Sequence, residues 1–146
     1  AALEMLEIEK PIYIKMPIDQ SEVETLALLK TIDPYTIAGV IFGNLTKDRN
    51  NPSMTTKDKA VWKTVVGNVS GKPTWHRSNT MIALTKKHFK NRFTIIGTGG
   101  IFSGADALEK MKLGADLLQL ITGMIFEGPQ TIGSINLTVA QNYRKK

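Results

Sequence analysis

The chain has 146 residues, of which 42% are hydrophobic and 22% are charged, and these proportions are ordinary for a globular domain with its own core. It contains no cysteine, which excludes disulfides, thiolate catalysis and thiolate metal sites. The formal net charge is +6, but the basic residues are divided between helix ends and a C-terminal tail. This spread favours solvated surfaces over a nucleic-acid-binding face, so we expect no nucleic-acid partner. We also expect no metal site, because His76 and His88 lack the close spacing of zinc ligands.

Strand and helix patterns alternate in the first half of the chain. Residues 1–10 indicate the end of a helix, and the apolar run at residues 11–16 predicts a strand. A capping box, Ser21-x-x-Glu24, then begins a helix with an apolar face. The run AGVIF at residues 38–42 predicts a second strand. The long polar stretch at residues 43–75 is expected to be irregular, and loops of this length in compact domains usually have a function.

The second half repeats the alternation of strands and helices. We expect helices at residues 78–89, from the Ser103 cap to about residue 113, and at residues 130–143, and strands at residues 93–96 and 117–121. Alternating units of this kind form parallel sheets.

The pattern therefore contains four βα units, whereas a closed parallel barrel needs eight and about 250 residues. Both edges of a four-stranded parallel sheet would also be open. We predict an α/β chain that forms the C-terminal half of a (β/α)8 TIM barrel, with residues 1–146 as a single partial domain. A fragment, a proteolytic product and one part of a split or dimeric assembly are the alternatives for its origin.

The most informative motifs are two glycine-rich strand ends, TIIGTGGIFSG at residues 94–104 and ITGMIFEGP at residues 121–129. Such ends after the last two strands of a barrel form a phosphate-binding site. The N–H groups of Gly97, Gly99 and Gly100 can converge on an anion. The N-terminus of the helix after Ser103 would add a partial positive charge. The alternative is that these glycines only serve tight turns.

These motifs carry a family resemblance. The segment GNVSGKP, followed by IIGTGGIFSGADALEKMKLGADLLQLITGMIFEGP, closely resembles the C-terminal half of class 2 dihydroorotate dehydrogenase, the quinone-linked flavoenzyme of pyrimidine synthesis. The likeness extends upstream through residues 14–17 with Asp19 and through residues 41–49, and so covers nearly the whole chain. A GGxxSG turn combined with a QLxTG…FEGP ending is typical of class 2 rather than class 1.

The resemblance implies that FMN is the cofactor, that dihydroorotate is oxidised to orotate and that quinone accepts the electrons. It implies substrate-binding residues at Asn44 and Leu45. It also implies cofactor-binding residues at Lys15, Gly43, Ser70, Gly71, Thr98, Gly99, Gly100, Ile121 and Thr122. This chain departs from the family pattern at Leu45, where a threonine hydroxyl is lost, and at Asn68, where glycine is usual; both changes bear on the choice of substrate.

Two of these residues have an independent physical rationale. Lys15 lies in an apolar strand, where a charge is costly unless it is paired, and a cation beside the flavin stabilises its reduced anionic form. A snorkelling surface lysine is the alternative. The Asn44 amide offers donors and an acceptor that suit the imide-like edge of orotate, although asparagine is also common in turns. We expect Lys72 to hold loops near the phosphate site, and Trp62 and Trp75 to be packing or lid residues.

In the resembling enzymes the catalytic base is a serine on a loop after the fourth strand. None of the serines in this chain corresponds to it, so we expect no catalytic residue here and no turnover by the chain alone. The missing N-terminal half or a second copy would be the partner. The resemblance implies peripheral attachment to the cytoplasmic side of the bacterial inner membrane, or to the mitochondrial inner membrane. Two alternatives remain: a non-catalytic phosphate-binding half-barrel that acts as an assembly module, and another phosphate-binding TIM-barrel enzyme without flavin.

Overall fold

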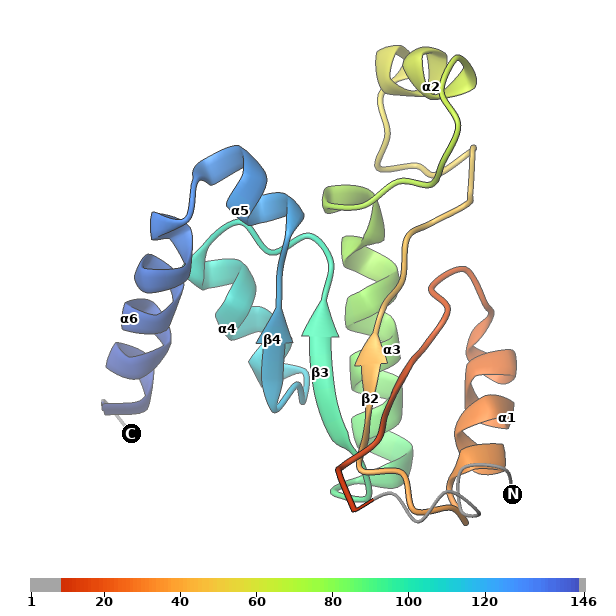
Figure 1. The fold of residues 1–146 in the computed structure, drawn as a ribbon, viewed down its shortest axis with the longest axis vertical. Helices are drawn as coiled ribbons and strands as arrows, with labels where there is room; N and C mark the ends of the chain where they lie inside the picture. Colours follow the sequence, from red (N-terminus) through yellow and green to blue (C-terminus); the bar gives the residue numbers. More distant parts are fainter. Residues whose placement is uncertain (1–8, 145–146) are drawn as a thin grey trace.

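The computed structural model describes residues 9–144, so the helix end expected at residues 1–10 lies almost entirely outside the described part of the chain. A single parallel sheet contains β1 (Tyr13–Lys15), β2 (Gly39–Phe42), β3 (Thr94–Thr98) and β4 (Leu117–Gln119), in the order β1-β2-β3-β4. Figure 1 shows β2, β3 and β4 running side by side in one direction, each followed by helical segments, and β1 pairs in parallel with β2. The predicted α/β class with four parallel strands is confirmed.

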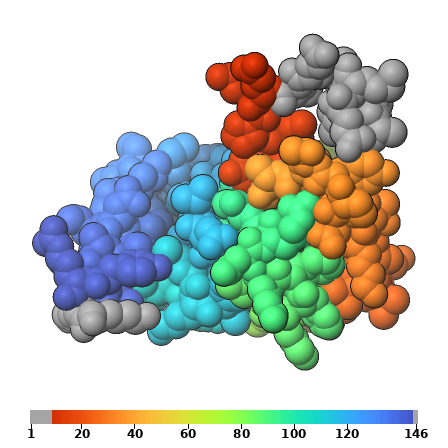
Figure 2. All heavy atoms as spheres, turned by 90° about the horizontal axis from the view of Figure 1, so that it is seen from below, coloured from red at the N-terminus to blue at the C-terminus, as the bar shows by residue number. Residues whose placement is uncertain are grey.

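Four main helices follow the strands: α1 (Glu22–Ile32), α3 (Trp75–Phe89), α4 (Gly104–Lys112) and α6 (Gln130–Arg144). The expected capping box begins α1, because the Ser21 hydroxyl accepts from the Glu24 N–H and the Glu24 carboxylate accepts from the Ser21 N–H at 2.8 Å. Viewed from below, the colours run in chain order across the molecule, from α1 at one side to α6 at the other (Figure 2). Successive βα units therefore lie beside one another.

The main core lies between the sheet and its helices. Val40 and Phe42 of β2 and Ile95 of β3 point to the helical side, where they pack with Met81 and Ile82 of α3, all five being 0% exposed. Alternate residues of a strand face opposite sides of the sheet, which is why Val40 and Phe42 share this face. A smaller cluster of Ile101, Ala107 and Ile135 joins α4 to α6.

The opposite face of the sheet carries a row of side chains across all four strands. Strand register places Lys15 beside Ile41, Ile41 beside Ile96, and Ile96 beside Leu117. Ile41 and Ile96 are half-buried, and Leu117 is 54% exposed. Figure 1 shows α3 behind β2, and Met81 and Ile82 of α3 belong to the cluster of Val40 and Phe42, the strand residues of the other face. Such a layer of inward-facing side chains is what a closed barrel packs at its centre.

The structure corrects several predicted boundaries. The stretch at residues 43–75 is not wholly irregular, because it contains α2 (Thr56–Lys63), the 3₁₀ turn η2 (Lys72–Thr74) and the start of α3 at Trp75 rather than at residue 78. A capping box of Thr55 and Asp58 begins α2. This helix was missed because its sequence, TKDKAVWK, has no apolar stripe.

The last predicted strand is also too long. β4 ends at Gln119, and Ile121 is instead the N-cap of a short helix, α5 (Thr122–Glu127). The run of residues 117–121, LLQLI, contains no glycine or proline, and a run of this kind does not reveal where a strand ends. In the part of the chain that the structure describes, no helix has the length and hydropathy needed to span a membrane.

Candidate functional site

A cleft of about 170 Å³ lies at the carboxyl ends of the four strands, the end where Figure 1 shows α5 and the segment carrying α2. All eleven residues predicted to bind flavin or substrate line it: Lys15, Gly43, Asn44, Leu45, Ser70, Gly71, Thr98, Gly99, Gly100, Ile121 and Thr122. Residues far apart in the sequence meet here because parallel strands end at the same edge of the sheet. Their contacts with a ligand remain a prediction.

Lys15 and Asn44 come from neighbouring strands. Lys15 is the last residue of β1, and its side chain is exposed. The loop after β2 is fixed to β1, because the Asn44 N–H donates to the Met16 carbonyl at 3.2 Å. The Asn44 side-chain oxygen accepts from the Leu45 N–H at 2.9 Å. Within residues 9–144 nothing accepts from the Asn44 side-chain NH₂ group, which leaves both of its hydrogens available to a ligand.

Three glycines allow the loops of the cleft to approach closely. Gly71, Gly99 and Gly100 have φ values of +77°, +92° and +74°, a region that residues with a Cβ rarely adopt. A Cβ on Gly99 would overlap the Thr74 hydroxyl, and one on Gly100 would lie 2.8 Å from the Trp75 Cβ. Gly99 and Gly100 therefore do more than end a strand, since they pack against Thr74 and Trp75, while Gly71 lies against Thr122 of α5.

The loop of residues 70–75 is bonded to α5 and is braced by a hydrogen bond of its own. The Thr122 hydroxyl donates to the Ser70 hydroxyl at 2.9 Å, which joins α5 to this loop. The Thr74 hydroxyl is 3% exposed and donates to the Gly71 carbonyl at 2.8 Å. Ser70, Thr122 and Thr98 thus place hydroxyl groups around backbone that has no side chains of its own.

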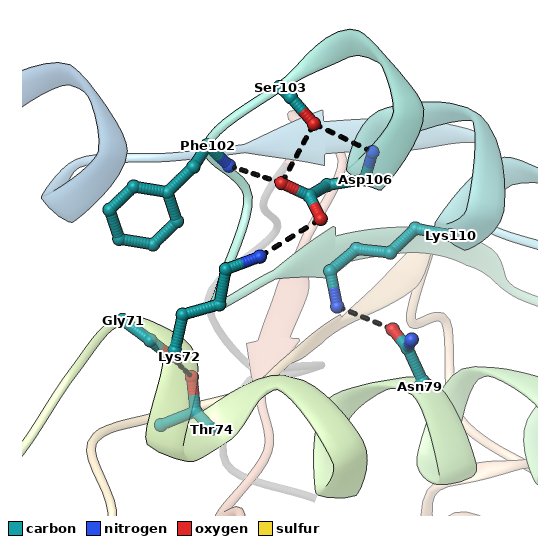
Figure 3. A network of polar contacts seen from close by, with 8 residues as sticks. All are labelled: Gly71, Lys72, Thr74, Asn79, Phe102, Ser103, Asp106 and Lys110. Carbon is teal, nitrogen blue, oxygen red and sulfur yellow. Dashed lines mark hydrogen bonds and ion pairs between the residues drawn. The ribbon is translucent and has the colours of Figure 1, made fainter. Parts of the chain in front are cut away.

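An ion pair supports the cleft from beneath. Lys72 Nζ lies 2.9 Å from Asp106 Oδ1, and Asp106 also accepts from the Phe102 N–H at 2.9 Å and from Ser103 (Figure 3). Burial alone would raise the pKa of Asp106, but the hydrogen bonds from Lys72, Phe102 and Ser103 outweigh it and hold that pKa below its usual value. Lys72 therefore holds the loop to the start of α4, the structural role expected from the sequence.

Five further residues line the cleft: Thr74, Ile101, Gln119, Leu120 and Gly123. Gln119 was missed because it lies within the apolar run assigned to a strand, and Thr74 because η2 was not predicted. Among the described lining residues there is one ammonium group, on Lys15, with hydroxyls and amides, and there is no carboxylate or imidazole. A site with hydrogen-bond donors and one positive charge suits an anionic ligand.

Comparison with known proteins decides the family. The family model described as dihydroorotate dehydrogenase matches residues 2–142. The chain belongs to the dihydroorotate dehydrogenase family.

Curated proteins similar to this chain carry the name "dihydroorotate dehydrogenase (quinone)". The protein of Christiangramia forsetii is 36% identical over 132 residues, which are 90% of this chain and 37% of that protein. The protein of Trichodesmium erythraeum is 36% identical over 133 residues, which are 88% of this chain and 35% of that protein. The chain thus spans about a third of the length of these dihydroorotate dehydrogenases.

The fold also resembles solved dihydroorotate dehydrogenases. The structure from Eimeria tenella in complex with ferulenol matches with a TM-score of 0.78 at 22% identity, over 91% of this chain and 34% of that one. The ligand-free structure from the same organism matches with a TM-score of 0.73 at 24% identity, over 84% and 33% of the two chains. At these identities the likeness concerns the fold, that of a TIM barrel of which this chain covers a part.

Proposed function

We propose that this chain carries the flavin-phosphate site, and part of the substrate site, of a quinone-linked dihydroorotate dehydrogenase. The reaction is the FMN-dependent oxidation of dihydroorotate to orotate in de novo pyrimidine biosynthesis, with quinone as the electron acceptor. One observation carries the proposal: in a chain of this family, all eleven residues predicted for the cofactor and substrate line a single cleft.

The described residues fit an FMN phosphate. The cleft backbone at Gly71, Gly99 and Gly100 lacks side chains and is closed on its far side by Thr74, Trp75 and Thr122, so a ligand can approach its amides directly. The hydroxyls of Ser70, Thr98 and Thr122 add donors that an anion requires. We assign the phosphate to these three loops.

Bound FMN would accept the hydride of the substrate and pass electrons to quinone. Lys15 would place a positive charge beside the ring system, where it stabilises negative charge on the reduced cofactor. Asn44 would orient the substrate through its free NH₂ group, and Leu45, which is 44% exposed, would offer an apolar contact.

The described cleft is only part of such a site. Its volume of about 170 Å³ is below the roughly 300–1,000 Å³ of typical small-molecule sites, and it has no carboxylate or imidazole among the described residues. We propose that residues 1–146 are one half of a barrel, and that another half supplies the remaining walls and the base serine. The apolar side chains of Ile41, Ile96 and Leu117, which lie side by side on the face of the sheet away from the main core, support this because a second half would bury them.

An assembly role is the second candidate. Both β1 and β4 are edge strands within residues 9–144, and open parallel edges favour pairing with further strands. A second copy of this chain would be the partner in that case. Sedimentation of the purified chain separates the two ideas, because a symmetric dimer without flavin supports the assembly module and a monomer contradicts it.

For the enzyme we propose peripheral membrane attachment, at the bacterial inner membrane or its mitochondrial counterpart, where quinone is available.

The test uses the assembled protein that contains this chain. We expect a yellow, flavin-bearing preparation that reduces a soluble quinone in the presence of dihydroorotate, while the 146-residue chain alone shows no turnover. Asn44→Ala should raise KM with little loss of bound flavin, whereas Ser134→Ala, on exposed α6, should change neither. A colourless assembled protein, or turnover by the chain alone, would contradict the proposal.

A further inference from the structure

Lys110 is the most unusual side chain outside the cleft. It lies on α4, and at 0% exposure it is completely buried, which is rare for a lysine without a partner. Its ammonium group donates to the Ser78 hydroxyl at 2.9 Å and to the Asn79 side-chain oxygen at 2.7 Å. It also lies 4.5 Å from the centre of the Trp75 ring. Figure 3 shows it reaching from α4 toward α3, below the Lys72–Asp106 pair.

The stem of Lys110 packs beneath β3. A Cβ on Gly97 would lie 3.3 Å from the Lys110 Cδ, so the absence of a side chain at Gly97 makes room for the lysine to pass. The buried lysine therefore lies between α4 and α3, directly under the strand that ends in the cleft.

Its partner Ser78 reaches that strand end. The Ser78 hydroxyl donates to the carbonyl of Thr98, the last residue of β3, at 2.6 Å, with the Phe42 carbonyl further away at 3.2 Å. A hydroxyl has one hydrogen to donate. Since Lys110 donates to the Ser78 oxygen, that hydrogen is directed to a carbonyl rather than to Lys110.

The Thr98 carbonyl and the Gly99 N–H belong to one peptide group. A trans peptide is planar, so its C=O and N–H point in opposite directions. Holding the carbonyl against Ser78 therefore directs the Gly99 N–H away from that hydroxyl, and Gly99 lines the cleft. The reverse orientation would present a carbonyl oxygen to an anionic ligand and repel it.

We propose that Lys110 is a positioning residue, which acts through Ser78 to hold the Thr98–Gly99 peptide with its N–H facing the anion. This rests on the proposed function, because the anion is taken to be the FMN phosphate. The role needs no contact between Lys110 and the ligand.

The experiment compares Lys110→Met, Ser78→Ala and the double variant in the flavin-loaded protein. We expect each single variant to weaken FMN binding about tenfold, the effect of one lost buried hydrogen bond. Because both residues act on the same peptide, the double variant should bind FMN no more weakly than the worse single variant. Leu29→Ala, a buried change on α1 at 0% exposure, is the control: it should lower stability without changing the FMN dissociation constant.

Amide hydrogen exchange at residues 98–101 tests the inference without any ligand. Lys110→Met should speed exchange at this turn more than at β2, whereas Leu29→Ala should not. A protein that fails to bind FMN contradicts the proposed function, and the exchange result then decides the role of Lys110. If Lys110→Met does not fold, Ser78→Ala carries both measurements. The inference is overturned if amide exchange at residues 98–101 is unchanged in Lys110→Met. It is also overturned if the losses of FMN affinity in the two single variants add together in the double variant.

Discussion

Replacing Gly99 with alanine is the sharpest test of how the cleft is built. Gly99 has a φ of +92°, and an added Cβ would overlap the Thr74 hydroxyl. Thr74 has little freedom to move, because its hydroxyl is buried and donates to the Gly71 carbonyl at 2.8 Å. The methyl group must therefore either displace this loop or force the turn to change shape.

The expected cost has two parts. An alanine held in the left-handed region loses about 1–2 kcal/mol, and forcing a methyl into packed space costs a further ~1–3 kcal/mol. We expect Gly99→Ala to lower the free energy of unfolding by about 2–5 kcal/mol. The matched control is Gly133→Ala in α6, where an added Cβ meets no atom within 4 Å, and where alanine should stabilise the helix by about 0.5–1 kcal/mol.

Urea unfolding of both variants measures the difference, and flavin absorbance of the same samples measures the effect on the cleft. Adding Thr74→Ala to Gly99→Ala removes the overlapping hydroxyl, and should restore part of the lost stability even though it also removes the hydrogen bond to Gly71. The reasoning is refuted if Gly99→Ala has the same free energy of unfolding as wild type. It is also refuted if adding Thr74→Ala lowers the free energy of unfolding of Gly99→Ala by as much as Thr74→Ala alone lowers that of wild type.

Three further predictions concern charge and capping. Burial lowers the pKa of Lys110 from 10.5 to about 7, so between these pH values the unfolded chain binds more protons than the folded one. The free energy of unfolding of wild type, relative to that of Lys110→Met, should therefore rise by about 2 kcal/mol from pH 7 to pH 9 in urea titrations. A difference that stays constant with pH would contradict this. Ser21→Ala should cost about 1 kcal/mol through the lost cap of α1, whereas Ser134→Ala should change stability by less than about 0.5 kcal/mol. Asp106→Asn should cost about 1–2 kcal/mol through the weakened bond to Lys72, and Lys72→Met in that background should add little, which thermal unfolding of both variants checks.

The Lys110 prediction depends on the groups that surround its ammonium. Asp106 and Glu109, on the same helix, favour the charged form, while Lys72 of η2 opposes it, and burial outweighs them all. Among the described residues, its direct hydrogen-bond and ring contacts on α3 are neutral: Ser78, Asn79 and Trp75. The stability of wild type relative to Lys110→Met should therefore be at its lowest below pH 7 and should rise above that pH.

The sequence by itself determined the order of the four βα units, the cap of α1 and the position of the cleft. Each of these depends on residues that are neighbours in the chain: Ser21 with Glu24, apolar runs that end in glycine, and the glycines after β3. Capping boxes and apolar runs involve residues only a few positions apart, so they can be recognised in the sequence without knowledge of the fold. The family resemblance rested on the same local motifs.

Only the tertiary structure decided how the cleft is supported. The hydrogen bonds from Lys110 to Ser78 and from Ser78 to Thr98 join residues separated by 32 and 20 positions, and no local pattern marks them. In the sequence, Lys110 is one of two lysines on α4; its complete burial follows from the space at Gly97 and from its contacts with α3. Contacts of this kind depend on how the layers meet, because burial and hydrogen bonding at long range are properties of the packed chain.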